Sequence, residues 1–115
     1  MMIKKEKDLL LTIKENIAGG EGKLQNIDIF LPEEMLGKAR KFSKMIIPAG
    51  ASIGRHAHDK DAEVYYVLKG EIVVTDNDKT FVLRQGEAMW TSQGDTHSVK
   101  NKTNADAEFL AIIMN

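Results

Sequence analysis

The histidines of this chain lie in two glycine-punctuated stretches whose spacing suggests metal chemistry. His56 and His58 are two residues apart within Gly50–Gly70, and Glu63 follows His58 by five residues. Side chains two apart on a β-strand point to the same face. Two imidazoles would therefore enter one space, where a carboxylate could join them.

The third and last histidine, His97, lies in the second stretch, Gly86–Asn101. Fifteen residues separate Gly70 from Gly86, enough for a hairpin of two strands and a tip. If the two stretches pair across a small barrel, His97 meets the other three groups inside it. Three neutral imidazoles and a carboxylate suit a divalent first-row metal, with bonds of about 2.0–2.2 Å. A six-coordinate ion held this way keeps two open positions, which is typical of catalytic rather than structural sites.

Size and composition fit one ordinary domain. The chain has 115 residues, of which 43% are hydrophobic and 29% are charged. A net charge of −1 excludes the basic footprint of a nucleic-acid-binding protein. The absence of cysteine excludes disulfides, thiolate catalysis and cysteine-type zinc sites. No apolar run reaches membrane-spanning length and no signal peptide is recognised, so we expect a cytoplasmic protein with no membrane partner.

The elements that must position these residues are short strands. Glycines at 19, 20 and 22 divide an N-terminal extension, residues 1–22, from a single domain over residues 23–115. The extension fits a short helix or a strand over Leu9–Ile13, and periodicity does not decide between them. The predicted strands of the domain are Leu24–Phe30, Phe42–Ile47, Ala62–Leu68, Glu71–Thr75, Thr80–Leu83, Ala88–Thr91, His97–Lys100 and Glu108–Met114. With only one helical turn, over residues 32–36, this pattern predicts an antiparallel sandwich or barrel.

Nine positions resemble, in register, the two sequence motifs of the cupin superfamily. They are Gly50, His56, His58, Glu63 and Gly70 in the first motif, and Gly86, Gly94, His97 and Asn101 in the second. Ser92 stands where the family usually has proline, and its loss should affect loop rigidity more than metal binding. The chain also resembles small single-domain bacterial cupins of the cupin 2 type, partly through Ser52–His58. The motifs cover about half of the chain.

The resemblance implies an all-β fold, a double-stranded β-helix or jelly roll (the cupin barrel), behind the short N-terminal extension. It implies His56, His58, Glu63 and His97 as ligands of one divalent transition metal ion, which could be Mn, Fe, Co, Ni, Cu or Zn. Asn101 would be structural, with its amide tying a loop backbone. The superfamily includes dioxygenases, decarboxylases, isomerases, epimerases, sugar-binding regulators and seed storage proteins, so the fold does not determine the function.

Alternation along the strand indicates what else lines the interior. Tyr65 and Val67 share the inward face with Glu63. The Tyr65 hydroxyl would then act on a substrate or a metal-bound water, which makes Tyr65 the candidate catalytic residue. A core aromatic with a satisfied hydroxyl is an equally good interpretation. One of Met89 and Trp90 should line the pocket, and we expect Trp90 in that place.

The function hypothesis is a metal-dependent enzyme that acts on a small chelating substrate, in the manner of a dioxygenase or decarboxylase, with isomerase chemistry also open. Beyond the ligand set the sequence offers no histidine or cysteine for acid–base or nucleophilic work. A general base would have to be Glu63, a tyrosine, an inward acid or metal-bound hydroxide. The alternative is a non-catalytic cupin that binds a metal or a small molecule, such as a sensor.

Two predictions concern the surface. The run Asp59–Asp61 is expected to form a solvated loop. Tyr66 should face outward together with Val64 and Leu68, and so much apolar outer surface predicts a subunit contact. We therefore expect a homodimer, in which residues 9–13 join the sheet of the partner.

Overall fold

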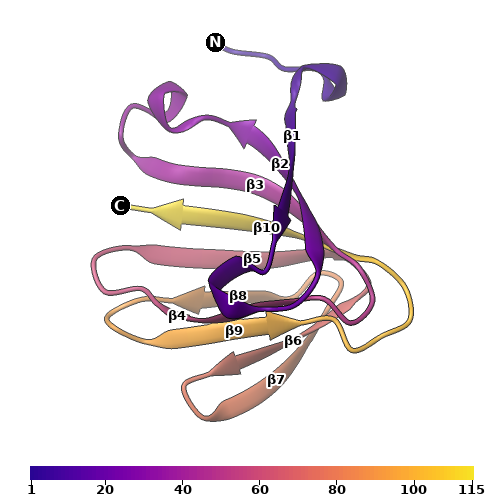
Figure 1. Cartoon of the computed structure of the whole chain (residues 1–115). Coiled ribbons are helices and arrows are strands. Elements are labelled where there is room, and N and C mark those ends of the chain that lie inside the picture. The colour runs from indigo at the N-terminus through magenta and orange to yellow at the C-terminus, as the bar shows by residue number, and fades with distance from the viewer.

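Two antiparallel sheets make up the computed structural model, which describes residues 1–115 (Figure 1). The strands are β1 (Leu10–Glu15), β2 (Lys23–Phe30), β3 (Ala39–Ile47), β4 (Ser52–Ala57), β5 (Ala62–Lys69), β6 (Glu71–Asp76), β7 (Lys79–Arg84), β8 (Ala88–Thr91), β9 (Thr96–Lys100) and β10 (Ala107–Met114). One sheet has the order β1-β2-β3-β10-β5-β8 and the other the order β4-β9-β6-β7. The predicted all-β jelly roll is confirmed. No helix in the structure is long and apolar enough to cross a membrane.

The core lies between the two sheets because apolar side chains alternate along the strands with period two. Its buried members are Leu24, Met45, Ile47, Ala51, Ile53, Tyr65, Val67, Ile72, Val74, Val99, Ala107, Phe109 and Ala111. Tyr65 and Val67 point inward as predicted, and Tyr66 between them is 40% exposed on the opposite face. The registers of β5, β10 and β3 therefore place successive inward positions in continuous rows across the large sheet.

Asn101 holds the loop between β9 and β10, as the resemblance implied. Its side-chain amide donates to the carbonyls of Ile47 and Ala105, each at 2.8 Å. Its amide oxygen accepts from the backbone N–H and the hydroxyl of Thr103, at 2.9 and 2.7 Å. A fully buried amide with all of these bonds satisfied fixes the backbone between the two sheets.

The N-terminal extension contains a strand rather than a helix. All six residues of β1 pair with β2, yet all six are exposed. The chain then makes a single 3-10 turn, η2 (Ile17–Gly19), which packs against β4. The approach is so close that a Cβ added at Gly54 would lie 2.0 Å from the carbonyl oxygen of Ala18. The domain boundary at residue 22 stays a prediction.

Two further 3-10 turns, η1 (Glu6–Asp8) and η3 (Pro32–Met35), complete the elements. The turn η3 confirms the helical turn expected near Pro32. β3 begins at Ala39, before the predicted start at Phe42. The prediction began the strand too late because the charged residues at its start obscure the alternation of apolar and polar side chains. Lys41 thereby becomes an inward strand position, on the same face as buried Ser43 and Met45.

Candidate metal centre

The four predicted ligands come from both sheets and meet at one end of the barrel. Glu63 lies near the start of β5 in the large sheet. In the small sheet His56 on β4 is the direct register partner of His97 on β9. His58 lies one residue beyond the end of β4, so only His56 of this pair is on the strand itself. All four side chains nevertheless converge.

The spacing of their donor atoms fits one metal ion. Glu63 Oε1 lies 2.9 Å from His97 Nε2, 3.1 Å from His58 Nε2 and 3.6 Å from His56 Nε2. The Nε2 atoms of His56 and His97 are 2.8 Å apart. Neighbouring ligands of an octahedral ion with bonds near 2.1 Å would be about 3.0 Å apart. One ion can therefore lie within bonding distance of the group.

Hydrogen bonds at Nδ1 prepare two of the imidazoles for this role. His56 Nδ1 bonds to the carbonyl of Gly54 at 2.8 Å, and His58 Nδ1 bonds to Asp61 Oδ1 at 2.8 Å. A carbonyl and a carboxylate only accept, so each Nδ1 carries a proton and donates it. The Nε2 lone pairs of both rings then face the centre, as metal ligation requires.

The third imidazole is held in the same way by Thr91, a buried residue of β8. Thr91 Oγ1 lies 2.9 Å from His97 Nδ1 and 3.5 Å from Met89 Sδ, to which it donates. The hydroxyl oxygen can therefore accept the proton of His97 Nδ1. The structure thus orients all three rings with the lone pair of Nε2 inward.

These groups need a cation between them. Three lone pairs and a carboxylate oxygen repel one another, and His58, Glu63 and His97 are each at most 4% exposed. Burial raises the pKa of Glu63, but hydrogen bonds from His56 and His97 and the nearby histidine charges lower it to about 2. The hydrogen bond to Glu63 raises the pKa of His56. In the metal-free protein a proton therefore occupies the space that the donor set offers to a metal.

Asp61 corrects one prediction from the sequence. Asp59 and Lys60 are exposed as expected, but the Asp61 side chain is only 8% exposed. It lies between His58, which donates to it, and Arg40 of β3, with which it forms an ion pair. The prediction was wrong because it rested on the composition of the loop. An acid three residues after His58, a candidate ligand, was the available signal.

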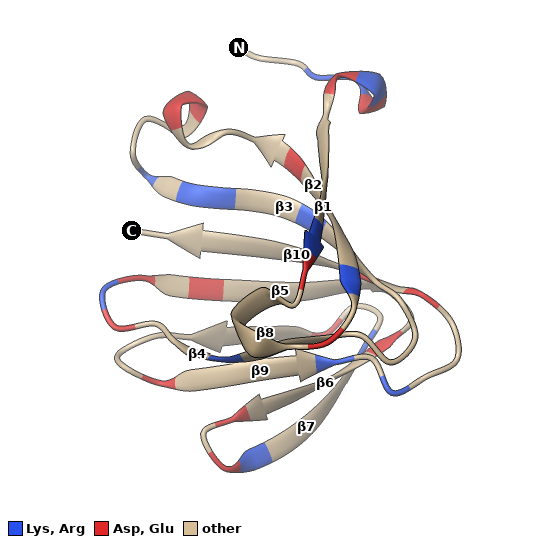
Figure 2. Ribbon diagram, viewed as in Figure 1, with Lys and Arg blue, Asp and Glu red and all other residues tan.

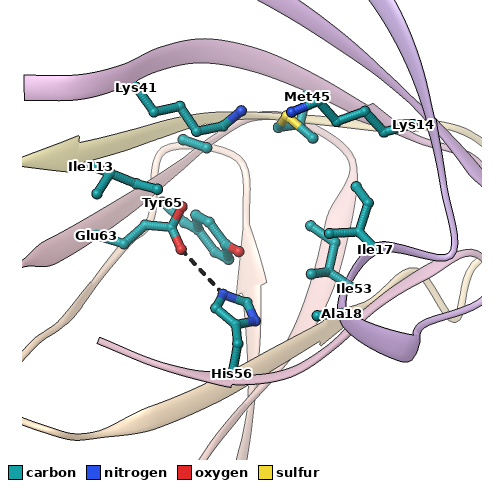
Figure 3. Close-up of a pocket in the computed structure, with 11 residues that line it drawn as sticks. Lys14, Ile17, Ala18, Lys41, Met45, Ile53, His56, Glu63, Tyr65 and Ile113 are labelled. Carbon is teal, nitrogen blue, oxygen red and sulfur yellow. Dashed lines mark ion pairs between the residues drawn. The ribbon is translucent and has the colours of Figure 1, made fainter. Parts of the chain in front are cut away.

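A cavity of about 260 Å³ opens beside the cluster (Figure 3). Its apolar wall consists of Ile17, Ala18, Met45, Ile53, Ala111 and Ile113, and its polar groups are Lys14, Lys41, His56, Glu63 and Tyr65. Of the four clustered side chains, only His56 and Glu63 line this cavity. A small molecule in the cavity would reach the metal position from one side.

Tyr65 lies in this wall, in the place that the alternation predicted. Its ring stacks on His97 with the centroids 5.1 Å apart and packs against Phe109 at 4.7 Å. Burial, together with the charge and hydrogen bonding of Glu63, raises the pKa of Tyr65 well above its ordinary value. The hydroxyl therefore stays protonated and can act as a donor. Its catalytic role stays a prediction.

Trp90 is outside the cavity, contrary to the prediction. β8 pairs with β5 so that Thr91 is opposite Glu63 and Trp90 is opposite Val64. Trp90 therefore shares the outward face of the sheet and is 61% exposed, with its indole N–H donating to Ser92 Oγ at 2.9 Å. Met89 points inward and packs against the core, but it does not line the cavity either.

Comparison with known proteins agrees with this architecture. The family model of the cupin domain matches residues 43–113. The chain belongs to the cupin family. It is 40% identical over 99 residues to an oxalate-binding protein of Thermotoga maritima, a match covering 86% of this chain and 82% of the relative.

Solved cupin structures show the same fold. A crystal structure from Thermotoga maritima, described as a predicted oxalate decarboxylase, superposes with a TM-score of 0.93 at 36% identity over 98% of each chain. The polyketide cyclase RemF of Streptomyces resistomycificus has a TM-score of 0.79 at 18% identity, covering 99% of this chain and 79% of RemF. The second similarity supports the fold alone.

Proposed function

We propose that this cupin binds one divalent transition metal ion through His56, His58, Glu63 and His97. The observation that carries the proposal is the convergence of three Nε2 lone pairs, oriented by bonds at Nδ1, on one carboxylate oxygen. The donor set accepts Mn, Fe, Co, Ni, Cu or Zn. When bound, such an ion would supply Lewis acidity toward the oxygens of a ligand.

We further propose a small chelating carboxylic acid as the ligand. The cavity of about 260 Å³ is slightly below the usual range for drug-sized ligands, roughly 300–1,000 Å³, and so favours a small molecule. His56 and Glu63 line it, so an acid there would meet the open side of the metal position. The relative's name as an oxalate-binding protein supports oxalate as the first acid to test.

Catalysis is the main hypothesis, in the form of decarboxylase- or dioxygenase-like chemistry on the bound acid. Tyr65 is the candidate catalytic residue, because its buried and protonated hydroxyl can donate to the acid or to a bound water. Non-catalytic binding is the alternative. The titratable side chains in the cavity are the two candidate ligands, Tyr65 and two lysines, and this short list favours the alternative.

Elemental analysis of protein produced without added metal, followed by reconstitution, tests the metal site. One bound equivalent supports the proposal, and no metal in the wild type with none taken up would overturn it. Calorimetric titration of the loaded protein with oxalate then tests the ligand class. Assays for formate and carbon dioxide, with oxygen uptake on other chelating acids and diols, separate catalysis from binding, and a Tyr65→Phe variant tests the hydroxyl.

We also infer a homodimer. Leu10, Leu11 and Ile13 of β1 are 55%, 53% and 54% exposed, and the outer edge of β1 has no partner strand. Pairing with a second copy would cover both. A monomer by light scattering at micromolar concentration would contradict this inference. The cytoplasmic location expected from the sequence stays a prediction, which cell fractionation would check.

A further inference from the structure

The inward face of β2 and β3 beside the cavity is unexpectedly polar, and Lys41 of this face lines the cavity itself. Inward positions of β2 and β3 carry Asn26, Asp28, Lys41 and Ser43, where a barrel core would ordinarily have apolar side chains. Asn26 and Ser43 are fully buried. Burying polar groups costs stability compared with an apolar core of the same shape. A polar patch in this place therefore calls for a functional explanation.

Within this polar patch, the ammonium of Lys41 has N–H donors that no hydrogen bond uses. Asp28 accepts from the amide of Asn26 at 2.9 Å and from the hydroxyl of Ser43 at 2.6 Å. Lys41 Nζ donates to Asn26 Oδ1. An ammonium has three N–H donors, and Lys41 makes no other hydrogen bond and no ion pair in the structure. Two of its donors therefore remain for a ligand.

A purely structural role does not account for Lys41. Lys41 and Asp28 attract one another but form no direct ion pair, and Asp28 Oδ1 instead accepts from the neutral groups of Asn26 and Ser43. The ammonium instead belongs to the cavity lining, together with the exposed Lys14 of β1. In Figure 3 the ammonium groups of Lys41 and Lys14 approach one another near Met45.

The strand register places this ammonium within reach of the metal centre. Lys41 on β3 and Glu63 on β5 are both direct partners of Ile113 on β10. The three residues form one row across the sheet, so the Cα atoms of Lys41 and Glu63 are about 10 Å apart, two strand spacings. Figure 2 shows the basic segment of β3 and the acidic segment of β5 on opposite sides of β10.

Resting on the proposed function, we infer that Lys41 is the specificity-determining residue of the cavity and selects small dicarboxylates. A dianion would chelate at the His56 and Glu63 side and receive the two free N–H donors of Lys41 from the other side. The charges agree: a divalent ion, Lys14 and Lys41 give +4, while Glu63 and Asp28 give −2. The net charge of +2 balances a bound dianion, whereas a bound monoanion leaves one positive charge of the site uncompensated.

The ionisation of Lys41 is consistent with a missing counter-ion. Burial and the charge of Lys14 lower the pKa of Lys41, and the attraction of Asp28 and Glu63 offsets this only in part. A carboxylate bound beside the ammonium would remove that imbalance. The pocket is thus arranged so that an acidic ligand stabilises the charge that the fold buries.

Oxalate and its monoanionic isostere oxamate test the inference with calorimetry on the metal-loaded protein. We expect the wild type to prefer oxalate, and we expect Lys41→Met to reduce that preference by about 10- to 100-fold, the usual loss for hydrogen bonds to a charged group. Metal affinity should stay within about twofold, because Lys41 is not a ligand. Lys44→Met is the matched control, since Lys44 lies on the outer face of β3 beside Glu108 and should change neither ratio.

The outcomes separate the two proposals. A wild type that takes up no metal refutes the proposed function, whereas a loaded wild type that binds oxalate and oxamate equally refutes only the role of Lys41. Unchanged preference in Lys41→Met would also overturn it. If Lys41→Met fails to fold by circular dichroism, Lys41→Gln takes its place, because it keeps a donor for Asn26 and removes the charge, and an unchanged preference in that variant would overturn the role of Lys41.

Discussion

Replacing Asp61 by asparagine tests how the fold prepares the metal centre. In the wild type one carboxylate oxygen accepts from His58 Nδ1 at 2.8 Å and the other pairs with Arg40. An asparagine has one accepting oxygen and one donating NH₂ group. It can serve His58 only by turning its NH₂ toward Arg40, where two donors would face each other. Either the orientation of the imidazole or the link to β3 is lost.

The magnitude follows from the burial of this pair. His58 and Asp61 expose only 4% and 8% of their side chains, so water cannot replace the lost bond readily. Loss of such an outer partner typically weakens metal binding by about 10- to 100-fold, which corresponds to roughly 1.4–2.7 kcal/mol. We expect Asp61→Asn to fall in that range and to keep its fold.

Competition with a chelating indicator measures the metal affinity directly. Asp59→Asn is the matched control, because Asp59 is exposed two residues away and should leave the affinity unchanged. An Asp61→Asn variant that binds metal as tightly as the wild type would refute the argument that the Nδ1 partner of His58 prepares the site. A loss of the same size in Asp59→Asn would show that the loop as a whole matters instead.

Three further predictions follow from the same geometry. His58→Ala should lose most of the bound metal and keep its circular dichroism spectrum; full metal retention would contradict the ligand assignment. Gly54→Ala should cost about 1–3 kcal/mol in urea unfolding, because its Cβ would lie 2.0 Å from Ala18 O, whereas Arg55→Ala should be near neutral. The pKa of Glu63 is lowered from 4.5 to about 2, so its contribution to metal-free stability, up to about 3 kcal/mol, is present above pH 4.5 and lost toward pH 2. Glu63→Gln should show a smaller loss over that range, and an identical pH profile would count against the shift.

The clustering of the four candidate ligands could be predicted because most of its signal is local in the chain, and the second motif supplied His97. His56, His58 and Glu63 lie within eight residues, and the motif glycines marked the turns around them. The core assignment of Tyr65 and Val67 followed from period-two alternation alone. These features depend on a single strand and its turns, for which sequence spacing is direct information.

Features that depend on pairing between strands and lie outside the two motifs escaped prediction. Trp90 was expected in the pocket, but its face is set by pairing with Val64 rather than by its own neighbours in sequence. Thr91 gave no signal as the partner of His97, because the two meet only through the packing of both sheets. The N-terminal extension forms a strand because it pairs with the edge of β2. The sequence of residues 1–18 alone does not reveal this pairing.

The two halves of the site lie on different sides of the start of the family match. All four proposed metal ligands lie within residues 43–113, which the cupin model describes. Lys14, Asn26 and Lys41 all precede residue 43 and come from β1, β2 and β3. A barrel built this way can keep its metal chemistry while the strands before the motifs change what the cavity accepts. Variation in charge at the position of Lys41 should therefore change the preferred acid without changing the metal, and this makes β3 the first place to look for specificity.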